Sequence, residues 1–175
     1  MNTLIIVDLQ EDFYSPDGSL YVRGAEILPE RIAGITENYN NVIFTLDWHP
    51  LNHCSFKQNG GPWPVHCLMY SRGASLPDEV LSKLDITRQN VFYYHKGNRS
   101  YEEEYEAFKS ISDELLKVLN DSEKIDICGL CGDYCVGLTL KRLAELGLKP
   151  KIRVLKELIG SIDDGTALNR YISEL

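Results

Sequence analysis

The sequence has few of the features that would suit a membrane or a nucleic acid. No apolar run approaches the ~20 residues of a membrane-spanning helix. Positive charge is in deficit, because 18 Lys and Arg face 26 Asp and Glu and give a formal net charge of −8. A protein that binds nucleic acid needs a basic patch. We therefore expect no nucleic acid and no membrane among its partners.

The sequence also lacks the marks of a secreted protein. Its first residues, MNTLIIVDLQ, have no basic region before the apolar run and are typical of a buried strand rather than of a signal peptide. The five cysteines are an odd number, which argues against a disulfide framework. We therefore expect reduced thiols in a cytoplasmic setting.

Repeats, low-complexity tracts and linkers are missing from the sequence, and 175 residues suit a single domain, 1–175. Short apolar runs alternate with helical patterns, which predicts a mainly parallel sheet covered on both faces. The handedness of such crossovers favours a three-layer α/β/α doubly wound fold of five or six strands. The predicted strands are Thr3–Val7, Asn41–Leu46, Asn90–Tyr94, Ile125–Gly129 and Lys151–Leu155. The predicted helices are Ala25–Asn38, Asp113–Leu119, Tyr134–Leu146 and Asp163–Tyr171.

One long segment, residues 47–90, interrupts this alternation. Its only helical pattern is Pro77–Leu84, and so long a connection in a compact domain is usually functional. Asp47 and His49 lie two positions apart and therefore point the same way from an extended backbone. With a third ligand from the loop they indicate a divalent metal site. The alternative is a polar surface loop with scattered histidines, which are His49, His53 and His66.

Polar side chains follow the first four predicted strands: Asp8, Asp47, Lys96 and, after a turn, Cys135. Ligands bind at the carboxyl ends of the strands in such sheets, so these side chains should meet in one crevice. A helix N-terminus and a neighbouring lysine both lower the pKa of a thiol, which suits Cys135 as a nucleophile. Asp8 could then take the thiol proton, and backbone amides of the turn Cys131–Cys135 could hold an oxyanion. The arrangement predicts an amidase or esterase.

Each of these residues also has a structural interpretation. Cys135 could be a small buried hydrophobe, Lys96 a solvated charge and Asp8 a cap at a strand end. Phe13 and Trp63 are residue types that usually lie in a core, although Trp63 in GGPWP could line a pocket. The acidic residues that are typical of a solvated helix face, and to which we assign no role, are Glu102, Glu103, Glu104 and Glu106.

On these residues the chain resembles the nicotinamidases, within the isochorismatase-like superfamily of cysteine hydrolases. The similarity runs from residue 3 to about residue 160 and is carried by IIVDLQEDF, DWHP with NHCSF, GGPWPVHC and GLCGDYCVGLTLKRLAELG. The resemblance implies an amidohydrolase that converts nicotinamide to nicotinate and ammonia through a cysteine thioester, in NAD salvage. Another small-amide or carbamoyl hydrolase of the superfamily, or a non-catalytic metal-binding or ligand-binding module, is the alternative.

The resemblance also implies roles for individual residues. It implies a catalytic triad of Asp8, Lys96 and Cys135. It implies one divalent metal, usually zinc and in some members iron or manganese, on Asp47, His49 and His66, with His53 as an optional fourth ligand. The substrate-binding aromatics would be Phe13, Trp63 and Tyr105. The oxyanion-hole amides would be those of Cys131 and Cys135, after a cis peptide bond between Leu130 and Cys131.

The chain departs from the family's usual pattern in two places. The usual Ala-Thr before the aspartate is replaced by Cys131-Gly132, where the lost hydroxyl could loosen the turn. The sequence ends soon after Tyr171, where relatives often add a strand, so we expect five strands or a vestigial sixth. Neither departure touches the triad or the metal set, and the sequence leaves a homo-oligomer open.

Overall fold

The computed structural model describes all residues from 1 to 175 and contains one parallel sheet of five strands in the order β3-β2-β1-β4-β5. The strands are β1 (Asn2–Val7), β2 (Asn41–Asp47), β3 (Asn90–Lys96), β4 (Lys124–Gly129) and β5 (Ile152–Ile159). The predicted five strands and the parallel pairing are therefore confirmed, and a sixth strand is not present.

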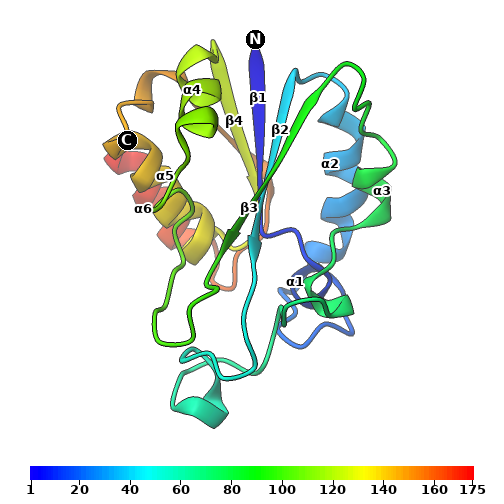
Figure 1. The fold of residues 1–175 in the computed structure, drawn as a ribbon, viewed down its shortest axis with the longest axis vertical. Helices are drawn as coiled ribbons and strands as arrows, with labels where there is room; N and C mark the ends of the chain where they lie inside the picture. The colour runs from blue at the N-terminus through cyan, green and yellow to red at the C-terminus, as the bar shows by residue number, and fades with distance from the viewer.

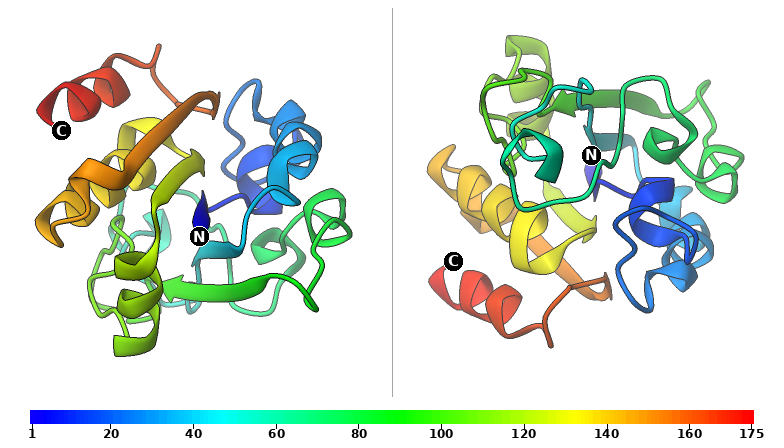
Figure 2. Two further views of the ribbon diagram at one scale, coloured as in Figure 1. Left: turned by 90° about the horizontal axis from the view of Figure 1, so that it is seen from above. Right: turned by 90° about the horizontal axis from the view of Figure 1, so that it is seen from below.

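Helices cover both faces of the sheet and complete the predicted three layers (Figure 1, Figure 2). One face carries α1 (Glu11–Tyr14), α2 (Leu28–Thr36) and α3 (Asp78–Leu81). The other face carries α4 (Asp113–Asp121), α5 (Gly137–Glu145) and α6 (Thr166–Glu174).

The central strand β1 shows why the strand sequences are continuously apolar. Leu4 and Ile6 belong to the core cluster shared with α2, whereas Ile5 and Val7 belong to the cluster shared with α5. Because successive side chains point to opposite faces and both faces are covered, every position of the strand after Asn2 is buried.

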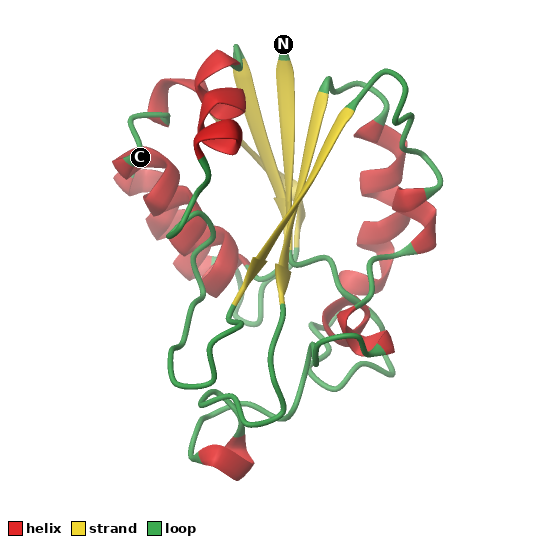
Figure 3. Cartoon of the chain, viewed as in Figure 1, coloured by secondary structure: helices red, strands yellow, loops and turns green.

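The topology places a crevice at the carboxyl ends of β1 and β4. The chain adds β2 and β3 on one side of β1 and then crosses to add β4 and β5 on the other side. The connections that leave the ends of β1 and β4 therefore run in opposite directions, which makes this position the topological switch point of the sheet. Ligands of doubly wound sheets bind at the switch point. The long connections gather at this end of the sheet, at the bottom of the view in Figure 3.

The structure also bears on the sequence expectations about thiols and membranes. All five cysteines are free, as predicted from their odd number. None of the helices combines the length and the apolar character needed to cross a membrane.

At the opposite end of the sheet, the buried carboxylate of Asp126 in β4 organises a polar cluster. It accepts two hydrogen bonds from Arg153, at 2.8 and 2.6 Å, and one from the hydroxyl of Tyr39. Lys124 lies 3.3 Å away. Burial by itself would raise the pKa of Asp126, but the hydrogen bonds from Arg153, Tyr39 and Lys124 outweigh it and hold the pKa below its ordinary value of 3.8.

Replacing Asp126 with asparagine should therefore destabilise the protein by about 2 kcal/mol at neutral pH, because the charged acceptor of several hydrogen bonds is lost. The folded-state pKa is depressed, so the contribution is complete above the ordinary pKa of 3.8 and disappears as the pH falls through the folded-state pKa. Urea unfolding of both proteins between pH 3 and pH 7 measures this difference. A difference that stays constant down to about pH 3 would contradict the assignment.

Candidate active site

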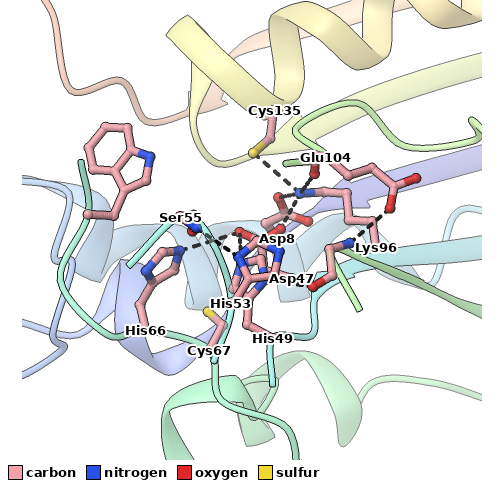
Figure 4. Close-up of polar contacts among 12 residues, drawn as sticks. Asp8, Asp47, His49, His53, Ser55, His66, Cys67, Lys96, Glu104 and Cys135 are labelled. Carbon is pink, nitrogen blue, oxygen red and sulfur yellow. Dashed lines mark hydrogen bonds and ion pairs between the residues drawn. The ribbon is translucent and has the colours of Figure 1, made fainter. Parts of the chain in front are cut away.

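Three side chains from different strand ends meet in the crevice (Figure 4). The ammonium of Lys96 lies 2.8 Å from the carboxylate of Asp8 and 3.4 Å from the sulfur of Cys135. The same ammonium also forms an ion pair with Asp47. Asp8 and Lys96 are fully buried, and Cys135 lies in the π-helical turn Gly132–Val136 that leads into α5. The predicted convergence of carboxylate, ammonium and thiol is thus present.

Backbone and side-chain contacts fix the two carboxylates. Asp8 has a φ of +45°, its N–H donates to the Thr45 carbonyl at 3.1 Å, and its Oδ1 accepts from the Thr45 hydroxyl at 2.7 Å. Gln10 brackets the backbone of Asp47, because its amide oxygen accepts from the Asp47 N–H and its amide nitrogen donates to the Asp47 carbonyl, both at 2.8 Å. Sequence reasoning gave Gln10 no role, although it lies two positions after Asp8 in the VDLQ motif.

The buried charges shift one another's pKa. Burial by itself would lower the pKa of Lys96, but Asp47 and Asp8 outweigh it and raise the pKa well above its ordinary value. Burial and Lys96 also act in opposite directions on the two carboxylates. Burial dominates at Asp8 and raises its pKa. At Asp47 burial also acts to raise the pKa, but Lys96, His49 and His66 together outweigh it and hold the pKa well below its usual range. Lys96 therefore stays charged, and Asp8 is the better proton acceptor of the two carboxylates.

The expectation of a thiol with a lowered pKa is wrong. Burial raises the pKa of the Cys135 thiol well above its ordinary value, and the charge of Lys96 offsets this only in part. The resting group is a thiol rather than a stored thiolate. One oxygen of Asp8 lies within 4.8 Å of its sulfur, so a base is close enough to take the proton when the thiol reacts.

Asp47, His49 and His66, the predicted metal ligands, lie together in a group that could hold a metal ion. One ligand atom from each lies within 4.8 Å of the other two. Each histidine donates its Nδ1–H to a backbone carbonyl at 2.8 Å, His49 to Gly97 and His66 to Pro64. Their Nε2 atoms then face Oδ2 of Asp47, at 3.5 and 3.8 Å. The two backbone carbonyls fix the tautomers of His49 and His66, so that both Nε2 lone pairs point toward the carboxylate of Asp47. This set of two imidazoles and one carboxylate fits a divalent metal.

His53 lies beside this group, with its ring centroid 4.1 Å from that of His49. Both of its nitrogens are engaged by the backbone. Nδ1 accepts from the N–H of Ser55 at 3.2 Å, and Nε2 faces the carbonyl of Glu102 at 3.1 Å. This arrangement leaves His53 no free lone pair and supports the three-residue ligand set rather than a fourth ligand.

An apolar pocket opens beside the triad and the metal ligands. It contains the three predicted aromatics, and the indole N–H of Trp63 donates to the hydroxyl of Tyr105 at 2.9 Å. Phe13 packs against His66 with ring centroids 5.5 Å apart. The lining residues are Phe13, Leu20, Asp47, Trp63, His66, Tyr105, Cys131, Tyr134, Cys135 and Ile162.

Sequence reasoning missed three of these lining residues, Leu20, Tyr134 and Ile162. The Tyr134 ring contacts Trp63 and Tyr105, with centroids 5.3 and 5.4 Å apart. Its position next to the nucleophile candidate was the one available indication. Leu20 and Ile162 come from loops, and no local pattern marked them.

The turn before Cys135 has the form that the resemblance implied. The peptide bond between Leu130 and Cys131 is cis. The N–H of Cys131 has no hydrogen-bond acceptor within the protein, so it is free to donate to a ligand. Gly132 packs so closely that an added Cβ would lie 2.3 Å from the Ser161 hydroxyl, which accounts for glycine at this position.

The run of glutamates is not a helix. Residues 101–112 form turns and loop that cross the site. Backbone carbonyls of this segment contact His53 and Lys96, from Glu102 and Glu104 respectively. The expectation of a solvated helix face without a role is therefore wrong.

A doubly wound parallel sheet with a cysteine, lysine and aspartate at its switch point, beside an Asp-His-His group, defines an isochorismatase-like hydrolase. No family model matches the chain. The nicotinamidase of Saccharomyces cerevisiae is 30% identical in an alignment covering 100% of this chain and 95% of that protein. The chain belongs to the nicotinamidase family.

Solved structures agree with this assignment. PnC1 from L. infantum in complex with nicotinate superposes with a TM-score of 0.81 and 32% identity, covering 99% of this chain and 87% of that one. The pyrazinamidase of Pyrococcus horikoshii in complex with zinc gives a TM-score of 0.79 at 27% identity, covering 99% and 93%. Family membership and the shared fold identify the chain as a hydrolase of amide C–N bonds.

Proposed function

We propose that the chain hydrolyses nicotinamide to nicotinate and ammonia, with Cys135 as the nucleophile. The contact of Lys96 with both Asp8 and Cys135, at the wall of an aromatic pocket, carries the proposal. The nicotinate complex of the L. infantum protein supports a pyridine ligand. The activity would recover the pyridine ring for NAD salvage.

The pyridine ring would lie among the aromatic side chains, with its carboxamide directed at Cys135. Phe13, Trp63 and Tyr105 line an apolar pocket that suits an aromatic ring. The hydrogen bond from Trp63 to Tyr105 fixes the orientation of this wall. His66 lies at the edge of the same pocket, so the ring nitrogen would approach the metal ligands.

Asp47, His49 and His66 would hold a divalent metal, which we propose to be zinc because the P. horikoshii relative binds it. When bound, the metal offers a Lewis-acid position that orients the substrate.

The chemical steps use the three buried side chains. Asp8 removes the thiol proton as the Cys135 sulfur attacks the carboxamide carbon, and the charge of Lys96 stabilises the developing thiolate. The new C–S bond leaves an oxyanion, for which the Cys131 N–H is a free donor, with the N–H of Cys135 as the second. Asp8 then gives the proton to the nitrogen, the C–N bond breaks and ammonia leaves.

Hydrolysis of the thioester repeats the proton transfers. Asp8 removes a proton from a water molecule that attacks the thioester carbon. The C–S bond breaks, nicotinate forms, and the sulfur regains a proton from Asp8. The raised pKa of Asp8 suits both directions of this transfer.

Ammonia release from nicotinamide, measured before and after chelation, tests the proposal. Metal-loaded protein should release one ammonia per nicotinate, and chelation should stop the reaction until metal is returned. A panel of other small amides and carbamoyl compounds is measured in parallel. Turnover of another amide without turnover of nicotinamide would contradict the proposal.

A further inference from the structure

The loop that carries Glu104 supports the metal ligands from outside the site. We propose that Glu104 is a positioning residue, which holds Gly97 so that the Gly97 carbonyl orients His49 toward the metal. The inference rests on the metal site of the proposed function. It assigns a role to a side chain that is hydrogen-bonded to none of the metal ligands and does not line the pocket.

The first link is between His49 and Gly97. The Nδ1–H of His49 donates to the Gly97 carbonyl at 2.8 Å, which leaves Nε2 as the atom facing Asp47. A hydrogen bond to the second ring nitrogen sets the tautomer and the ring orientation of a metal-ligating histidine. The position of the Gly97 carbonyl therefore decides where Nε2 points.

The second link is between Gly97 and Glu104. Oε2 of Glu104 accepts from the N–H of Gly97 at 3.0 Å. This is the only hydrogen bond of the carboxylate, and Glu104 forms no ion pair. Its charge is thus directed at one buried backbone amide, and charge-assisted bonds of this kind are stronger than neutral ones.

The same peptide unit is held from its other side. The carbonyl of Lys96, which belongs to the Lys96–Gly97 peptide, accepts from the N–H of Trp48 at 2.9 Å. Trp48 lies between the ligands Asp47 and His49 in the sequence. Glu104 and Trp48 therefore hold the Lys96–Gly97 peptide unit from both sides. This unit joins the proposed catalytic lysine to Gly97, whose carbonyl orients His49.

Gly97 leaves little freedom for an alternative arrangement. Its φ is +65°, and an added Cβ would lie 2.4 Å from Cε1 of His49. The histidine ring therefore packs directly on the glycine backbone. If Gly97 moved slightly after losing its contact with Glu104, the His49 ring would have to move with it, because no side chain lies between them.

Zinc affinity measured by equilibrium dialysis, without substrate, tests the inference on Glu104→Ala, Glu104→Gln and Glu106→Ala. Glu104→Ala should weaken zinc binding by about 10–100-fold, as loss of a supporting hydrogen bond does at other metal sites. Glu104→Gln keeps an oxygen acceptor for the Gly97 N–H and should stay within about threefold of the parent. Glu106→Ala removes a carboxylate of the same loop that makes no hydrogen bond or ion pair, and it should bind zinc like the parent.

The outcomes separate this inference from the proposed function. Normal zinc affinity in Glu104→Ala, or equal losses in the alanine and glutamine variants, would overturn the role of the hydrogen bond while leaving the metal site intact. A parent protein that binds no zinc would refute the zinc site of the proposed function. Activity at saturating zinc adds a second measurement: recovery in Glu104→Ala agrees with a role in holding the metal ligand, whereas a persistent loss of kcat would contradict it.

Discussion

Replacing Cys135 with alanine is expected to lower kcat for nicotinamide by at least about 10⁴-fold, because removal of a nucleophile abolishes the covalent route. The fold and the metal ligands should be unaffected, since Cys135 lies outside the Asp47, His49 and His66 group. Steady-state ammonia release and metal content, measured on the same preparation, give both quantities.

The matched control is Cys54→Ala. Cys54 is a free thiol in the long loop, is not part of the pocket, and should be replaceable with little change in kcat. If Cys135→Ala kept more than about 1% of the parent kcat, the covalent mechanism would be wrong. If it lost bound metal as well, the thiol would have a structural role at the metal group.

Replacing His49 with alanine is expected to weaken metal binding by at least about 100-fold and to raise KM for nicotinamide with it. The ligand group has only three members, so loss of one leaves two donors. Metal content after dialysis and KM at a fixed low metal concentration measure the two effects. Because the proposed metal orients the substrate, the two effects should be linked.

His95→Gln is the control for this variant, because His95 is the one histidine outside the cluster and is exposed on β3. It should retain both metal and KM. Full metal content in His49→Ala would refute the ligand assignment. Loss of metal with an unchanged KM would refute the orienting role alone.

The sequence determined the sheet and the meeting of its strand ends. Five short apolar runs could be buried only in a sheet covered on both faces, and parallel strands bring their carboxyl ends to one edge. Asp8, Asp47 and Lys96 were predictable for this reason, since each directly follows or ends a strand. The pair Asp47 and His49 was predictable because an extended backbone turns alternate side chains the same way.

Only the tertiary structure decided what these groups do to one another. The pKa of Cys135 depends on its burial by distant segments, which outweighs the nearby lysine and reverses the expectation from the helix N-terminus. His53 is engaged by backbone groups of Ser55 and Glu102, the second of which is far away in the sequence. Glu104 was predicted to be a surface residue. Its hydrogen-bond partner is the backbone N–H of Gly97, and a sequence pattern does not reveal contacts to the backbone. Local periodicity reports which residues are buried, whereas hydrogen bonds and desolvation in the site depend on contacts between segments that only the folded chain brings together.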